Sequence, residues 1–112
     1  MDRILIEGGI PLTGTLPISG SKNAVLPLMV AALLSDQPVT LRGTPRLADT
    51  RTLASVLREL GAEVEEFGNG PGEGMQVHAG DLSSVRAPYE LVSKMRASFW
   101  VLGPLLARAQ KA

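Results

Sequence analysis

Apolar and polar residues alternate along the first 20 positions in the manner of β-strands. Residues 3–9 (RILIEGG) and 12–19 (LTGTLPIS) each predict a strand, with Pro17 at an edge or irregular position of the second. Residues 22–34 are then apolar on almost every side. A segment of this kind predicts a buried helix rather than a surface one, and Ser21 stands where its N-cap would be.

The middle of the chain repeats the change from strand to helix. Residues 38–43 (PVTLRG) predict a short strand, and residues 50–60 predict a helix that Asp49 caps and Gly61 ends. The helix prediction rests on apolar residues that recur at helical spacing, namely Leu53, Val56, Leu57 and Leu60.

The last third predicts a hairpin followed by helix. Residues 62–67 and 74–80 are two short strands on either side of a glycine-rich loop. Residues 89–111 have helical spacing again, with a kink or stop expected at Gly103-Pro104.

Two of the predicted helices look related. When Ala24 is placed on Ala97, a shift of 73 residues, each helix has a polar residue before the alanine and an apolar run with one proline after it. We therefore predict an α/β fold built of β–α–β–α–β–β repeats, with the second copy only begun at residue 112. We therefore expect the sequence to be the front part of a longer protein.

Composition narrows the class of protein. The chain has 112 residues, enough for at most one domain, and its 11 basic and 11 acidic residues cancel, so no basic patch suggests nucleic acid. It has no cysteine, which excludes thiolate metal sites and a cysteine nucleophile within these residues, and we predict neither a metal nor a cofactor. The apolar run 24–34 is interrupted by Pro27 and is shorter than the roughly 20 residues of a membrane span. With no signal peptide recognisable, these features favour a soluble, cytoplasmic protein.

Lys22-Asn23 is the strongest candidate for chemistry. A helix N-terminus offers unpaired N–H groups and a partial positive charge, and here a lysine amine and an asparagine amide are added to it. Phosphate or carboxylate is the natural guest, although a lysine that merely reaches water beside a helix cap is a common alternative. The stretch is not a P-loop, because Ser21 separates Gly20 from Lys22 and no Ser or Thr follows the lysine.

Arg96 and Trp100 form a second candidate site. They are four residues apart, so they would share one face of an α-helix. An arginine beside an aromatic ring can hold an anionic or planar ligand, or it can simply stack on the ring for packing.

Three stretches together resemble the UDP-N-acetylglucosamine enolpyruvyl transferases, a branch of the superfamily that includes 5-enolpyruvylshikimate-3-phosphate synthase. They are ISGSKNAVLPLMVAALL, LADTRTLASVLRELGAEVE and APYELVSKMRASFWVLGPLLAR, in the family's order and over essentially the whole chain. The shikimate enzymes share a Gly-Ser-Lys turn but usually continue with Ser, whereas Asn23 follows the lysine here.

The resemblance implies an activity and a set of site residues. Members transfer the enolpyruvyl group of phosphoenolpyruvate to the 3-hydroxyl of UDP-N-acetylglucosamine and release phosphate, the first committed step of peptidoglycan synthesis. Lys22 and Asn23 match the pair that holds phosphoenolpyruvate, with Lys22 also catalytic. Arg96 matches an arginine assigned to UDP-N-acetylglucosamine, and Trp100 a nearby aromatic residue of less secure role.

The resemblance also implies an architecture that this chain covers only in part. Members are two-domain inside-out barrels, in which residues 1–20 would supply strands to the other domain. Residues 21–112 would form the first repeat and the start of the second repeat of the substrate-binding domain. The family's mobile loop, with its usual cysteine general acid, lies beyond residue 112. We therefore expect little or no turnover from these residues alone. The alternatives are a non-catalytic phosphate-metabolite-binding module, a 5-enolpyruvylshikimate-3-phosphate synthase-like enzyme, or a structural piece that pairs with a second copy.

Overall fold

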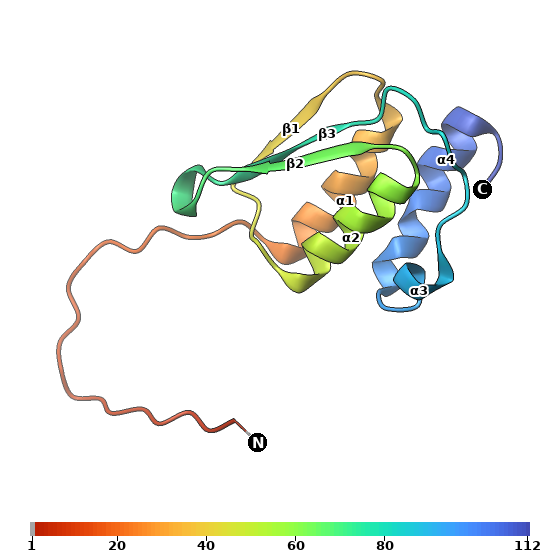
Figure 1. Cartoon of the computed structure of the whole chain (residues 1–112). Coiled ribbons are helices and arrows are strands. Elements are labelled where there is room, and N and C mark those ends of the chain that lie inside the picture. The colour runs from red at the N-terminus through yellow and green to blue at the C-terminus, as the bar shows by residue number, and fades with distance from the viewer. Residues whose placement is uncertain (1) are drawn as a thin grey trace.

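A computed structural model describes residues 2–112 as two layers, with helices packed against one face of a small sheet (Figure 1). The sheet has three antiparallel strands in the order β1-β3-β2, comprising β1 (Val39–Arg42), β2 (Glu63–Phe67) and β3 (Gly74–His78). The helices are α1 (Lys22–Ala31), α2 (Ala48–Glu59), α3 (Tyr89–Val92) and α4 (Leu102–Ala109). Three 3-10 turns complete the fold: η1 (Ala32–Leu34), η2 (Gly70–Gly72) and η3 (Arg96–Val101). The predicted α/β class is confirmed.

Successive side chains of each strand point to opposite faces of the sheet. Val77 lies opposite Val39 on one side and Val64 on the other, and this row faces the helices. On the other face, Gln76 donates a hydrogen bond to the Thr40 hydroxyl at 3.4 Å. The predicted hairpin and the predicted strand over residues 38–43 are therefore confirmed.

Helix α2 packs one face into the core, and the predicted leucine and valine positions of this segment are fully buried. It ends as predicted at Gly61, whose φ is +101°. The Gly61 N–H bonds to the Arg58 carbonyl at 2.9 Å, and the Ala62 N–H bonds to the Leu57 carbonyl at 3.0 Å, which closes the last turn.

The start of α2 differs from the prediction, because Asp49 is not its N-cap. The helix begins at Ala48 after Leu47, which places Asp49 inside the first turn. The Thr50 hydroxyl accepts the Leu47 N–H at 3.0 Å and lies 2.8 Å from the Leu47 carbonyl oxygen. Thr50, which is fully buried, thus holds the helix start from within.

The predicted helix over residues 22–34 is confirmed as α1 continued by η1. The prediction that this helix is buried on every side is wrong. Val25, Leu26, Met29, Val30 and Leu33 face the core, whereas Leu28 is 51% exposed and Leu34 is 56% exposed. Ser21 occupies the N-cap position through its backbone: its carbonyl accepts the Ala24 and Val25 N–H groups, and its side chain makes no capping bond.

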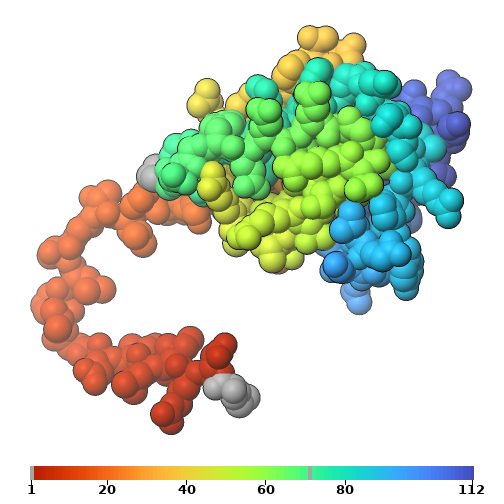
Figure 2. Space-filling view, in the orientation of Figure 1, coloured from red at the N-terminus to blue at the C-terminus, as the bar shows by residue number. Residues whose placement is uncertain are grey.

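The predicted strands 3–9 and 12–19 are wrong for this structure. Residues 2–20 contain no strand and form an exposed arm, of which residues 2–16 run away from the body while residues 17–20 approach the end of β1 (Figures 1 and 2). Their large apolar residues are at least four-fifths exposed. A strand needs a neighbour for its backbone groups, and β1, β2 and β3 pair only with one another.

The C-terminal helical segment is broken elsewhere than predicted. It consists of α3, η3 and α4, and the breaks fall after Val92 and where the 3-10 turn passes into the α-helix at Leu102. Gly103-Pro104 does not stop it, because α4 continues from Leu102 to Ala109. Pro104 lies in the first turn of α4, where its missing N–H removes no hydrogen bond that the α-helix needs.

Candidate functional site

The starts of α1 and α2 lie side by side, and α3 lies on the same lower side of the body but farther along it, beneath α4 (Figure 1). Helix α1 packs against α2 and against η3. The predicted residues Lys22 and Asn23 begin α1, and Arg96 begins η3, so all three stand at the starts of helical segments that pack together.

Lys22 is the first residue of α1, and its amine is paired. The Lys22 Nζ lies 2.5 Å from Asp49 Oδ2, and the two side chains are 52% and 38% exposed. Asn23 is also exposed on the same first turn. The Ala24 and Val25 N–H groups bond to Ser21, so the N–H groups that precede them are those left at the helix end for a guest.

Arg96 and Trp100 are exposed in η3, but the expected common α-helical face is not formed. A 3-10 helix has about three residues per turn, which aligns Arg96 with Phe99 and turns Trp100 away by about a third of a turn. Phe99 is 71% exposed and Trp100 is 48% exposed. The aromatic residue nearest in register to Arg96 is therefore Phe99, which the α-helical spacing did not indicate.

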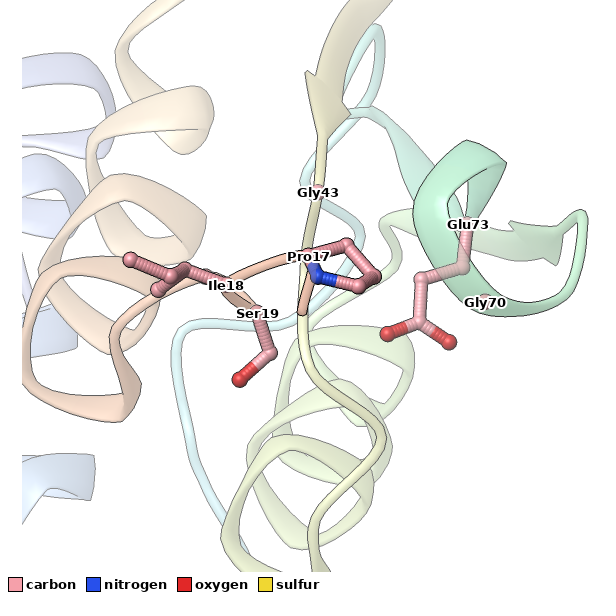
Figure 3. A pocket seen from close by; sticks show the side chains of 7 residues that line it. Pro17, Ile18, Ser19, Gly43, Gly70 and Glu73 are labelled. Atoms are coloured by element: carbon pink, nitrogen blue, oxygen red, sulfur yellow. The ribbon is translucent and has the colours of Figure 1, made fainter. Parts of the chain in front are cut away.

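One hollow lies beside the predicted residues rather than at them. It has a volume of about 180 Å³ and is lined by residues that approach from the arm, from the end of β1 and from the η2 loop, namely Pro17, Ile18, Ser19, Gly20, Gly43, Gly70 and Glu73 (Figure 3). A methyl group on Gly20 would overlap the Gly43 carbonyl oxygen, which explains a glycine there. Lys22, Asn23, Arg96 and Trp100 do not line it.

Two classes of site have no support among residues 2–112. No group of three or more His, Cys, Asp or Glu side chains is placed to hold a metal ion. None of the helices in this range is long and apolar enough to cross a membrane. His78 instead lies 3.5 Å from Glu63 across the β2–β3 pair.

Comparisons with known proteins identify relatives over the full chain. The chain is 52% identical over 118 residues to the UDP-N-acetylglucosamine 1-carboxyvinyltransferase of Afipia carboxidovorans and 52% identical over 112 residues to that of Caulobacter vibrioides. Both alignments cover 100% of this chain but only 28% and 26% of those proteins, so the chain spans about a quarter of their length.

A solved structure and a family model agree with these relatives. The fold matches the crystal structure of the enolpyruvyl transferase NikO from Streptomyces tendae with a TM-score of 0.72 and 28% sequence identity, over 90% of this chain and 23% of that one. The model of the EPSP synthase (3-phosphoshikimate 1-carboxyvinyltransferase) family matches residues 6–112. A match over nearly every residue shows that the chain belongs to the EPSP synthase family of enolpyruvyl transferases.

Proposed function

We propose that the molecule of which these residues form a part transfers the enolpyruvyl group of phosphoenolpyruvate to the 3-hydroxyl of UDP-N-acetylglucosamine. Phosphate is released, and the product feeds peptidoglycan biosynthesis in the cytoplasm. The observation that carries the proposal is the 52% identity over the whole chain to proteins named UDP-N-acetylglucosamine 1-carboxyvinyltransferase.

The start of α1 is the proposed site for phosphoenolpyruvate. Lys22 would meet the phosphate and the charge that develops during addition and elimination, and Asn23 would supply amide contacts. A fixed cation and a helix N-terminus aimed at developing negative charge stabilise a transition state more than the ground state. The exposure of both side chains supports this role, because a substrate can reach them.

Arg96 is the proposed contact for UDP-N-acetylglucosamine, with Trp100 beside it. Arg96 is exposed at the start of η3, which packs against α1, the helix that begins with Lys22, so a ligand can reach its guanidinium. Trp100 is half-exposed and can offer a ring face to a sugar or base.

The proposed architecture extends beyond the observed two-layer unit. Residues 1–20 would pair as strands with another domain, and residues 21–112 would be the first repeat and the start of the second in an inside-out barrel. The exposed apolar arm and the exposed apolar residues on α1 support this, because both need a covering surface. With about a quarter of its relatives' length, the chain alone would have little or no turnover.

A hybrid enzyme tests the function. These 112 residues replace the aligned segment of the Caulobacter vibrioides relative, and phosphate release from phosphoenolpyruvate is measured with UDP-N-acetylglucosamine as acceptor. We expect turnover, and we expect Lys22→Ala to abolish it, while Lys111→Ala, a lysine near the exposed C-terminus, serves as the matched control. A folded hybrid without turnover, or a fully active Lys22→Ala variant, contradicts the proposal.

The acceptor is a separate question, because the family model is named for a 3-phosphoshikimate enzyme. The hybrid is therefore also assayed with 3-phosphoshikimate, which we expect to be inert. Calorimetry of the 112-residue chain with phosphoenolpyruvate addresses the alternative of a binding module. Heat of binding from the chain, combined with an inactive hybrid, would favour that alternative.

A further inference from the structure

The Lys22–Asp49 pair joins the first turns of two different helices, and the roles proposed above make no use of Asp49. Its 2.5 Å separation is the shortest ion-pair distance in the described part of the chain; the Arg46–Glu66 and His78–Glu63 distances are 4.0 and 3.5 Å. Helix α2 begins with Thr50 bonded to Leu47, so the Asp49 carboxylate does not cap the helix.

The pair is poorly suited to stabilising the fold. Both side chains are more than a third exposed, and ion pairs of this kind contribute little to stability because water screens the charges. The larger effect of the pair is to restrict the lysine side chain, which is otherwise free to adopt many rotamers. Asp49 has a short side chain on a rigid helical turn, so it fixes the ammonium at the ends of both helices.

We propose that Asp49 is a positioning residue for enolpyruvyl transfer, which holds the Lys22 ammonium in its working orientation before phosphoenolpyruvate arrives. An ammonium has three N–H donors, so one directed at Asp49 leaves two for the phosphate. The positive ends of α1 and α2 still favour an anion beside the neutralised pair. The inference rests on the proposed function, because it assigns Asp49 a role only through Lys22.

Kinetics of the hybrid enzyme test the proposal. A catalytic group displaced by about 1 Å can lose about 100-fold in rate, so we expect Asp49→Asn to lower kcat by about 10- to 100-fold. The KM for phosphoenolpyruvate should change less than about threefold, because the lysine charge that attracts the anion remains. Asp49→Glu should recover part of kcat, and Glu59→Gln, an exposed carboxylate at the other end of α2, is the control. An unchanged kcat overturns the proposal, as does a lowered KM, which would show that Asp49 competes with the substrate.

Amine labelling of the 112-residue chain provides a readout that does not depend on activity. Lys22, Lys94 and Lys111 are the three lysines, so the latter two are internal references. We expect Asp49→Asn to raise the labelling rate of Lys22 severalfold and to leave the other two unchanged. Unchanged labelling of Lys22 overturns the proposal even if the hybrid is inactive. An active hybrid that needs Lys22 but not Asp49 leaves the proposed function intact and removes only this inference.

Discussion

Arg108 is the residue whose replacement should most clearly loosen α4 from the rest of the fold. It lies on α4, and its guanidinium donates to backbone carbonyls of two other segments. Its Nη1 lies 3.0 Å from the Leu33 carbonyl oxygen at the end of η1 and also bonds to the Ala79 carbonyl after β3. Longer contacts of 3.4 Å reach Ser35 and Gly80. One side chain thus ties α4 to the end of the first helix and to the exit of the sheet.

The size of the effect follows from these contacts. A hydrogen bond to a charged group contributes about 1.5–3 kcal/mol, and two bonds from Arg108 are short while two are marginal. Because the side chain is partly exposed, water replaces part of the loss. We therefore expect Arg108→Met, which keeps much of the aliphatic stem, to lower the free energy of unfolding by about 2–3 kcal/mol.

Urea unfolding of the 112-residue chain, followed by circular dichroism, measures this loss. With a slope of about 1.5 kcal/mol/M, the midpoint should fall by about 1.3–2 M. Arg108→Lys keeps the charge but not the fork of donors, so it should lose about half as much. Arg51→Met, an exposed arginine on α2, is the matched control and should stay within about 0.5 kcal/mol. If Arg108→Met has the same urea midpoint as the wild type, the carbonyl contacts do not hold α4 in place.

Four other changes test the packing of the same fold by urea unfolding. Leu57→Ala, in the fully buried face of α2, should cost about 3–5 kcal/mol, whereas Leu28→Ala on the exposed side of α1 should cost less than about 1 kcal/mol; equal losses would contradict the observed burial. Gly61→Ala should cost about 1–3 kcal/mol, because φ is +101° and the new methyl group would lie 2.7 Å from the Ser83 nitrogen, and a neutral result would mean that the turn relaxes freely. Deleting residues 2–14 should leave the midpoint unchanged, since this part of the arm is exposed, and a lower midpoint would reveal contacts with the body.

The elements predicted correctly are those whose pattern and partner both lie within residues 22–80. Helix α2 has its apolar stripe, its glycine stop and the sheet that covers it in one continuous stretch, so local sequence determines all three. Residues 3–9 of the arm have an equally clear strand pattern, but no strand lies beside them in the structure. The pattern alone could not reveal that this neighbour is missing. The same limit applies to α1, whose composition predicts burial on every side while Leu28 stays half-exposed.

The site shows the limit more sharply, because it depends on shifts of one or two residues. Lys22 could be placed at a helix start from Gly20-Ser21 and the apolar run that follows, which are local signals. The role of Asp49 could not be placed, because the difference between an N-cap and a first-turn residue is two positions. At the N-cap, the Asp49 carboxylate would accept hydrogen bonds from backbone N–H groups. Inside the first turn, it instead pairs with Lys22 on a different helix. Arg96 is equally sensitive to a small change in local structure. Its neighbour on the same face is Phe99 in a 3-10 helix, whereas it would be Trp100 in an α-helix. Local patterns therefore located the charged residues, and only the packing of α1 on α2 and η3 determines which groups those charges meet.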